Sequence, residues 1–333
     1  MVRQRAQVIW RSDDPFSCCL MRVFTLLAAT LGTVSSFSVA TLGSARRSAA
    51  PLVVMQESSS LVSSLKNVAA WKGKAVVVKY GGHAMTNDDR AAEFASDIAL
   101  LQALGVRPIV VHGGGPQINA MLERLEVQSE FVNGLRKTTP EVMEVVEMVL
   151  CGSLNKKIAS KINAAGGRAI GISGKDDCLV TATQRDPALG LVGDPKSVRV
   201  PLLESLLDAG VVPVIAPVAT GEGGASYNVN ADTMAGVIAT SLNAASLLLL
   251  TDVTGVLDGP PPEGKLLPRL TAAEAKALTE DGTATGGMIP KLGTAMDAVA
   301  GGVGEAVIMD GRVPHCALEH LFGEDDIGTA VCA

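Results

Sequence analysis

The sequence predicts an α/β protein whose mainly parallel central sheet is sandwiched by helices. Short continuous apolar runs recur along residues 56–333, and helical stretches separate most of them. Such runs are expected of strands that are covered on both faces. Many of the 35 glycines stand at the ends of the predicted elements, while aromatic residues make up only 3% of the chain. Alanine, valine, leucine and isoleucine must therefore build the core.

Six strands are predicted first, at 74–80, 107–113, 168–174, 211–218, 246–253 and 305–311. Between them, the stretch 88–105 places Phe94, Ile98 and Leu101 on one helical side and ends at Gly105. A second long helix is predicted over 140–166, with Pro140 at its first position. Two β-ribbons, near 131–139 and 176–184, interrupt the alternation and are predicted to form a flap over the substrate.

The first 55 residues are predicted to be a targeting presequence. They hold six arginines and two aspartates, whereas the rest of the chain holds 22 basic and 32 acidic residues, a balance that argues against a nucleic-acid-binding protein. From Met21 a basic start, a short apolar run and small residues are typical of a secretory signal, and an acid-free segment with Arg46 and Arg47 follows from Phe37. This bipartite pattern predicts that the protein is targeted to the stroma of a plastid of secondary origin. A disordered N-terminus, or a true start at Met21 rather than Met1, is the alternative.

The six cysteines form no C-x-x-C pair and no cluster with histidine. Neither a zinc site nor a disulfide framework is indicated, and a reducing compartment is expected.

Glycines and charges gather where the predicted strands end. Lys79, Gly113–Gly115, Gly174 and Asp252 all fall at carboxyl ends, which is where open parallel sheets bind their ligands. We therefore expect one crevice lined by several strand ends.

The stretch "VVHGGGPQIN" is a strand, three glycines and then a helix start. Its backbone N–H groups can approach an anion closely, and a helix N-terminus adds partial positive charge. A plain tight turn explains three glycines equally well. If the strands 74–80 and 107–113 are neighbours, however, the ammonium of Lys79 and these amides converge on one phosphate-sized anion.

A second lysine, Lys291, and a carboxylate, Asp232, are further candidates for the same anion-binding site. Lys291 follows Gly286 and Gly287 in the first turn of a predicted helix, where a lysine opposes the helix dipole and is expected to serve a ligand. Asp232 can either cap a helix or hold both ammonium groups. Arg136, just after a glycine turn, is a candidate clamp for a carboxylate.

Six ordered motifs resemble the amino-acid kinase family over about residues 56–331. They are V-V-K-Y-G-G, V-V-H-G-G-G-P-Q-I-N, N-G-L-R-x-T, N-V-N-A-D, L-T-D-V-x-G-V-L-D and G-G-M-x-x-K. Each motif alone is weak, but six in order are specific. Within the family, the chain is most similar to the branch that phosphorylates the side-chain carboxylate of N-acetyl-L-glutamate in arginine biosynthesis.

The resemblance implies an N-terminal lobe, 56–243, for N-acetylglutamate and a C-terminal lobe, 244–333, for ATP. Mg²⁺ would be held by ATP, with no protein ligand. The implied catalytic residues are Lys79, Lys291 and Asp232. The implied substrate-binding residues are Gly114, Gly115, Arg136 and Asn228. The implied phosphate- and nucleotide-binding residues are Gly81, Gly82, Thr251, Asp252, Gly255, Leu257, Asp258, Gly287 and Met288.

Regulation is implied by the two ends of the matching region. Residues 58–74 resemble the extra N-terminal helix of arginine-inhibited members, and 315–331 resembles their C-terminal signature, with matches at His315, Glu319 and Gly328. Asn67 and Asp326 replace the usual aromatic and glycine, and His83 stands where a small residue is common. The implied partners are an arginine effector, a homohexamer built as a trimer of dimers, and the PII signalling protein.

Three other functions remain open from the residues. A sister kinase could act on aspartate, glutamate, carbamate or UMP. A catalytically silent arginine-sensing or scaffold subunit would lack the lysine pair, which is present here. A dinucleotide oxidoreductase would need G-x-G-x-x-G at its first helix, and that fingerprint is absent.

Overall fold

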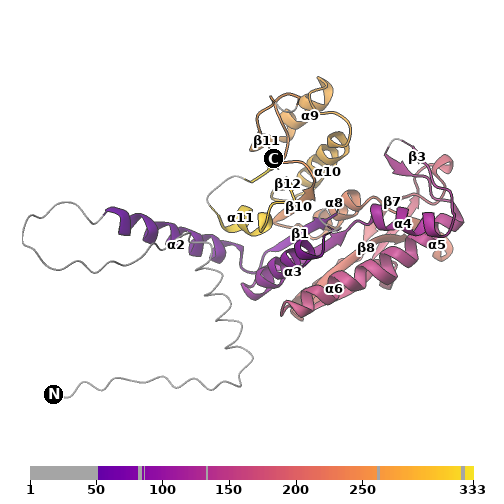
Figure 1. The fold of residues 1–333 in the computed structure, drawn as a ribbon, viewed down its shortest axis with the longest axis horizontal. Helices are drawn as coiled ribbons and strands as arrows, with labels where there is room; N and C mark the ends of the chain where they lie inside the picture. The colour runs from indigo at the N-terminus through magenta and orange to yellow at the C-terminus, as the bar shows by residue number, and fades with distance from the viewer. Residues whose placement is uncertain (1–51, 82–84, 86, 133, 261–262, 324–326) are drawn as a thin grey trace, which may run out of the picture. The chain divides into compact units, whose positions relative to one another are not determined.

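The computed structural model describes residues 52–333, apart from 82–84, 86, 133, 261–262 and 324–326, and the side chains from Val62 onward (Figure 1). Contacts divide the chain into Met1–Met55 and Gln56–Ala333, and the fold given below is that of the second unit. The predicted presequence lies almost entirely outside the described residues. Helix α2, however, already begins at Leu52.

The strands are, in chain order, β1 (Ala75–Tyr80), β2 (Arg107–His112), β3 (Phe131–Val132), β4 (Leu135–Arg136), β5 (Ala169–Gly174), β6 (Val180–Gln184), β7 (Gly193–Val198), β8 (Val212–Thr220), β9 (Ser226–Asn228), β10 (Ser246–Thr251), β11 (Arg269–Thr271), β12 (Ala306–Asp310) and β13 (Thr329–Cys332). The helices are α2 (Leu52–Trp71), α3 (Asp88–Ala103), α4 (Gly115–Arg124), α5 (Pro140–Glu147), α6 (Asn155–Ala164), α7 (Val200–Asp208), α8 (Ala231–Ser241), α9 (Ala272–Glu280), α10 (Met288–Ala300) and α11 (Cys316–Phe322). A π-helical segment, η2 (Met148–Leu154), joins α5 to α6.

One sheet dominates the described residues, with the strand order β11-β13-β12-β10-β1-β2-β8-β6-β7 and with β5 and β9 also paired to β8. Its central pairs, β12/β10, β10/β1, β1/β2 and β2/β8, are parallel. Antiparallel pairing occurs toward the edges, at β12/β13, β6/β7 and β8/β9. The predicted fold class is therefore confirmed.

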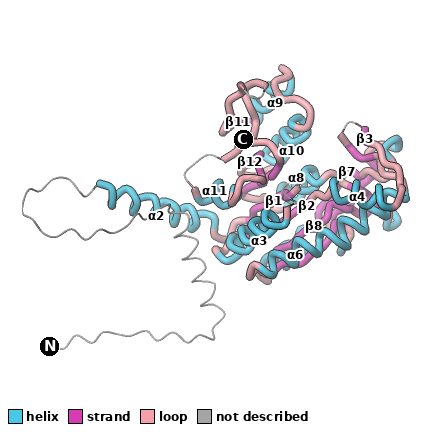
Figure 2. Tube along the Cα trace, viewed as in Figure 1, coloured by secondary structure: helices cyan, strands magenta, loops and turns pink. Residues whose placement is uncertain are grey.

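Alternate residues of β1 face opposite cores. Val76, Val78 and Tyr80 pack in the core formed with α3, α4, α5, α6 and α11, whereas Val77 packs in the core formed with α7, α8, α9 and α10. Figure 2 shows α3, α4, α6, α8 and α10 around the strands. Since side chains alternate along a strand, Lys79 lies on the same face as Val77, toward α8 and α10.

The six apolar runs form β1, β2, β5, β8, β10 and β12, as predicted. Helix α3 ends at Ala103, one residue before its C-cap Leu104, and Gly105 follows at φ +84° in the left-handed region. The ribbon near 131–139 is the β3/β4 pair. The second ribbon is different: β6 pairs with β7 but also joins the main sheet through Thr181 and Thr220 of β8.

Candidate active site

Two lysines from distant parts of the chain share one largely buried carboxylate, that of Asp232. The Lys79 ammonium, near the end of β1, lies 3.0 Å from Asp232 Oδ1. The Lys291 ammonium, in the first turn of α10, donates a hydrogen bond of 2.8 Å to Asp232 Oδ2. The side chains are only 10%, 17% and 12% exposed for Lys79, Lys291 and Asp232 respectively. Two cations against one anion leave an excess of positive charge at this point.

Asp232 is available for the lysines because Asn230 caps the helix in its place. The Asn230 side chain accepts hydrogen bonds from the N–H groups of Asp232 and Thr233, so the capping role that the sequence allowed for Asp232 is taken. Burial alone would raise the pKa of Asp232, but the ammonium groups of Lys79 and Lys291 outweigh it and hold that pKa below its usual range. The carboxylate is therefore ionised at neutral pH.

Two glycine turns meet beside Lys79. A Cβ added to Gly81 would lie 2.7 Å from Lys79 Nζ, so a side chain there would displace the ammonium. Gly113 donates its N–H to the carbonyl of Tyr80 at 2.8 Å, which joins the end of β2 to the end of β1. The prediction that the Gly113 amide would contact an anion is therefore wrong, because that N–H is already used. Gly82 lies outside the described residues.

The amides of Gly114 and Gly115 follow at the start of α4. Gly115 is the first residue of this helix and Pro116 the second, so the positive end of the helix dipole lies at the glycine turn. Gly114 must lack a side chain, because a Cβ there would come within 2.5 Å of Leu150 Cδ2 on η2. The π-helical segment thus packs directly beneath the turn.

Arg136 is buried at the end of β4, with only 7% of its surface exposed. Its guanidinium donates to Asn119 Oδ1 at 2.6 Å and to Ser129 Oγ at 2.9 Å, and it stacks over the ring of Phe131. Burial lowers the pKa of Arg136. A guanidinium carries five N–H donors, so these two hydrogen bonds fix the fork without using all of it.

Thr138 connects Arg136 to Asn228. Its hydroxyl donates to the carbonyl of Arg136 at 2.9 Å, and it accepts from the Asn228 amide at 3.1 Å. The two predicted substrate-binding residues are thus brought together through a fully buried threonine, the last residue of the motif N-G-L-R-x-T, to which the sequence analysis gave no role. Its place in that motif does not reveal its contact with Asn228, because Asn228 belongs to a distant strand.

The loop 251–258 leaves the carboxyl end of β10. Thr251 is its last strand residue and contacts Asp252 Oδ1 at 3.2 Å. Gly255 has φ +150°, and a Cβ there would lie 2.6 Å from Leu266 and 2.7 Å from the hydroxyl of Thr329. Leu257 forms an antiparallel β-bridge with Leu266, and Asp258 Oδ1 accepts a hydrogen bond of 2.7 Å from the N–H of Lys265. The second predicted nucleotide loop leads into α10: Gly287 is the residue before this helix, and Met288 is its first residue.

These parts share one end of the sheet. Lys79 pairs with Leu249 of β10 and with Val111 of β2, so the carboxyl ends of β10, β1 and β2 lie in register. The helices α4 and α8 and the helix α10 begin near these ends, at Gly115, Ala231 and Met288. Among the described residues, the predicted catalytic residues Lys79, Asp232 and Lys291 are all in contact, as the sequence analysis expected.

The predicted effector residues lie elsewhere, around α11. His315 precedes this helix at φ +56° and its Nδ1 lies 2.6 Å from Asp97 Oδ1, while Glu319 is in its first turn. Burial lowers the pKa of His315, but the bond to Asp97 outweighs it and raises that pKa; burial also raises the pKa of Asp97 to about 6. Asn67 of α2 donates to the carbonyls of Phe322 and Gly323 at the other end of α11. Gly328, at φ +81°, packs against β12, and Asp326 and His83 lie outside the described residues.

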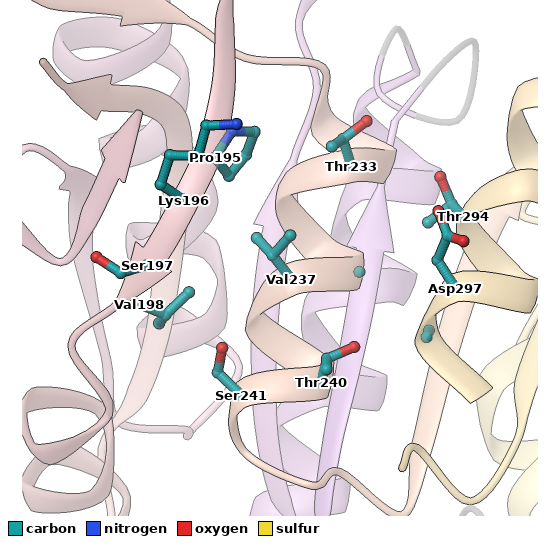
Figure 3. Close-up of a pocket in the computed structure, with 12 residues that line it drawn as sticks. Pro195, Lys196, Ser197, Val198, Thr233, Val237, Thr240, Ser241, Thr294 and Asp297 are labelled. Atoms are coloured by element: carbon teal, nitrogen blue, oxygen red, sulfur yellow. The ribbon is translucent and has the colours of Figure 1, made fainter. Parts of the chain in front are cut away.

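A cavity of about 320 Å³ lies between β7, α8 and α10 (Figure 3). Thr233, Val237 and Thr240 of α8 form its floor, and Lys196 and Asp297 lie on opposite sides. None of the predicted site residues lines it. This cavity therefore does not lie at the charged cluster.

Residues 52–333, in their described parts, hold no group of three or more His, Cys, Asp or Glu side chains placed to bind a metal ion. In the same residues no helix is long and apolar enough to cross a membrane. The two ammonium groups and the glycine amides instead suit an anionic ligand, and a triphosphate that carries its own Mg²⁺ fits this donor set.

Comparison with known proteins gives a consistent picture. The model of the amino acid kinase family matches residues 74–310. The acetylglutamate kinase of Acidiphilium cryptum (strain JF-5) is 53% identical over 283 residues, which cover 81% of this chain and 94% of that protein. The acetylglutamate kinase of Rhizorhabdus wittichii is 52% identical over 292 residues, covering 84% and 96%.

Two solved structures share the fold. N-acetylglutamate synthase from Neisseria gonorrhoeae, complexed with coenzyme A and N-acetyl-glutamate, matches with a TM-score of 0.73 at 23% identity over 83% of this chain. This chain spans 63% of the length of that synthase. Carbamate kinase from Giardia lamblia bound to AMP-PNP matches with a TM-score of 0.59 at 19% identity, over 78% of this chain and 98% of its own. At these identities the likeness concerns the fold alone.

Proposed function

This chain belongs to the amino acid kinase family, and on that premise we propose that it is an acetylglutamate kinase. The reaction transfers the γ-phosphoryl group of ATP to the side-chain carboxylate of N-acetyl-L-glutamate and yields an acyl phosphate and ADP. The observation that carries the proposal is the pair of ammonium groups on Asp232, at the carboxyl ends of parallel strands, of which that of Lys79 is buried and that of Lys291 is half-buried.

Phosphoryl transfer to a carboxylate needs no strong base. A glutamate-type carboxyl has a pKa of about 4.3, so the acceptor is already ionised at neutral pH. What remains is to hold two anions in line and to balance the charge that spreads over the moving phosphoryl group. MgATP supplies that group, and its magnesium ion neutralises part of the triphosphate charge.

Each residue then has one task. Lys79 and Lys291 stabilise the negative charge of the transition state from two sides, and Asp232 keeps both ammonium groups in place. The N–H groups of Gly114 and Gly115 bind the phosphoryl oxygens, with Gly81 and Gly82 in the same role on the β1 side. Arg136 and Asn228 hold the α-carboxylate of N-acetylglutamate. Residues 251–258 and 287–288 bind the nucleotide, so that ATP belongs to the lobe 244–333 and N-acetylglutamate to 56–243.

Substrate identity is tested by an ADP-release assay run in parallel on N-acetylglutamate, aspartate, glutamate, carbamate and UMP. Hydroxylamine trapping should give a hydroxamate with N-acetylglutamate, because an acyl phosphate reacts with it. Turnover of another acceptor at a higher kcat/KM would replace the proposed substrate.

The lysine pair is tested by Lys291→Ala. Loss of a charge that acts mainly in the transition state should lower kcat by about 100-fold or more while the circular dichroism spectrum stays that of the parent. The matched control is Lys276→Ala on α9, whose ion pair with Glu280 is 68% and 67% exposed. A Lys291→Ala enzyme within threefold of the parent would remove this lysine from the catalytic site.

Regulation and assembly follow from the same resemblance. We infer a homohexamer in which α2 contacts a second copy, and its exposed apolar side chains, Val62 at 49% and Leu65 at 56%, support this. An arginine effector is proposed near His315, Glu319 and Gly328, where Asn67 ties α2 to α11. Light scattering with and without the double change Val62→Glu and Leu65→Glu tests the assembly, and titration of activity with arginine tests the effector.

Two further proposals rest on the sequence pattern. Residues 1–55 direct the chain to a plastid stroma, and the PII signalling protein is a partner there. Imaging of a fluorescent fusion of residues 1–55 tests the first, and co-elution with purified PII tests the second. A fluorescent signal in the cytosol would contradict plastid targeting. Separate elution of the two proteins at micromolar concentration would contradict the PII partnership.

A further inference from the structure

His112, the last residue of β2, is fully buried next to the glycine turn. Its Nδ1 lies 2.8 Å from the carbonyl oxygen of Gly113, and its Nε2 lies 3.1 Å from the amide nitrogen of Asn155. Asn155, the first residue of α6, is also fully buried. None of the roles assigned above uses this histidine, although it touches the turn that they depend on.

The neighbours of the ring select one tautomer. A carbonyl oxygen only accepts, so Nδ1 must carry the proton, and Nε2 of a neutral ring must then accept. Asn155 can donate to it, because its amide nitrogen also faces the carbonyls of Val214 at 2.8 Å and Ile172 at 3.2 Å, while its oxygen accepts from Lys156. Burial lowers the pKa of His112 to about 4, and the Lys156 ammonium acts in the same direction. The ring is thus neutral at pH 7.

The bond to Gly113 also fixes the next amide. In a trans peptide the carbonyl of Gly113 and the N–H of Gly114 point in opposite directions. Holding that carbonyl against the buried ring therefore turns the Gly114 N–H away from the ring. The N–H of Gly113 cannot take its place, since it is bonded to Tyr80. Glycines have no side chain to restrain their own backbone, so an external restraint is needed.

We propose that His112 is a positioning residue for phosphoryl transfer, and that its Nδ1–H, by holding the Gly113 carbonyl, points the Gly114 N–H at the phosphoryl oxygens. Asn155 supports the ring from the other nitrogen. This inference rests on the role proposed above for the glycine turn, and it adds the group that orients that turn.

Two substitutions separate the two nitrogens of the ring. In His112→Asn, the amide nitrogen occupies the place of Nδ1 and keeps the bond to Gly113. In His112→Gln, the longer side chain reaches the place of Nε2 and keeps the bond to Asn155 but loses the one to Gly113. Both variants remove the ring, so both lose similar packing and one hydrogen bond.

The expected result is a difference in kcat that stability does not explain. His112→Gln should lower kcat by about 100-fold, the usual cost of one misplaced donor to a transition-state oxygen, with both KM values within about threefold. His112→Asn should keep at least about a third of the parent kcat, and the two variants should melt within a few degrees of each other. Equal kcat in the two variants, or a better His112→Gln, would overturn the proposal.

A measurement on the unaltered protein keeps the proposal testable if neither variant folds. In ¹⁵N spectra of the histidine rings at pH 7, the signal assigned to His112 should be that of a neutral ring with the proton on Nδ1. A proton on Nε2 of His112 would overturn the inference. The tautomer is read without any turnover, so this result is independent of whether the proposed reaction itself is correct.

Discussion

Asp232 sets the electrostatics of the site at the scale of one residue. Its carboxylate is nearly buried and forms ion pairs with the ammonium groups of Lys79 and Lys291. Removing one partner of such a buried ion pair leaves a charge that neither water nor protein compensates. Its folded-state pKa lies below the ordinary value. The ionised carboxylate therefore favours the folded state at any pH above the pKa of the unfolded chain.

Asp232→Asn should lower the free energy of unfolding by about 3 kcal/mol at pH 7. Because a depressed carboxyl pKa gives stability that is present above the unfolded value and lost as pH falls through the folded value, the gap between parent and variant should narrow below about pH 4. Urea titrations across pH measure this. Asp208→Asn is the control, since Asp208 is 73% exposed in its pair with Arg107. A gap that does not change with pH would contradict the assignment.

Arg136→Lys should raise the KM for N-acetylglutamate by about 10-fold, a loss of about 1.4 kcal/mol of binding. Lysine cannot reproduce the planar fork that Asn119 and Ser129 hold. Steady-state kinetics with each substrate varied in turn measure the effect, with kcat expected to change little. Arg185→Lys, in an exposed pair with Asp194, serves as the control. An unchanged KM would remove Arg136 from the substrate clamp.

At the scale of elements, the glycine turn packs tightly against two leucines of η2. A methyl group on Gly114 would overlap Leu150 and Leu154, whereas nothing lies within 4 Å of one on Gly115. Overpacking of a tight contact between a turn and a helix forces one of them to move. The neighbouring glycines thus have different reasons to be glycine.

Gly114→Ala should destabilise the protein by about 2 kcal/mol, a typical cost of overpacking. Gly115→Ala should change stability by less than about 0.5 kcal/mol, as expected of a substitution without contacts. Chemical denaturation of both variants measures the difference. Equal free energies of unfolding for the two variants would mean that η2 moves aside at little cost and does not support the turn.

The apolar runs of the sequence were sufficient to predict six strands, among them the half-exposed β5, but not the four-residue β13, which contributes Ala330 and Val331 to the two cores, nor β7 and β11. β7 and β11 are half-exposed, so their residues carry no continuous apolar signal. The π-helical segment within 140–166 was also missed, because seven residues are too few for its period to be distinguished from that of an α-helix.

The same division holds for the site. Lys79 and Lys291 could be predicted because a lysine close to a pair of glycines, at the end of a strand or the start of a helix, is conspicuous in the sequence. Asp232 could be predicted because it follows Asn228 and Asn230 on alternate positions before a helix. The role of Thr138 could not be predicted although it stands in the motif N-G-L-R-x-T, because its contact with Asn228 depends on pairings between distant segments, such as the bridge from Thr138 to Gly190. The use of the Gly113 amide by Tyr80 likewise depends on the register of two strands.

At the scale of the whole molecule, ligand binding should stabilise the fold. With MgATP at 100 times its Kd, the free energy of unfolding should rise by about 2.7 kcal/mol. Thermal melts with and without nucleotide measure the shift. Chelation of the metal by EDTA should reduce it, and Lys291→Ala should reduce it further, since that variant loses one of the two cations that face the triphosphate. A shift that is insensitive to both would place the nucleotide elsewhere.

The position of β1 has a consequence for how the chain matures. Val76 pairs with Pro108 on one side and with Ser246 on the other, so one flank of this apolar strand is satisfied early in translation and the other only after most of the protein has been made. Non-local pairing of this kind slows folding and leaves an unpaired, aggregation-prone strand edge exposed on the nascent chain. Newly synthesised molecules should therefore depend on chaperones until β10 arrives, and a truncated chain that stops before Ser246 should aggregate.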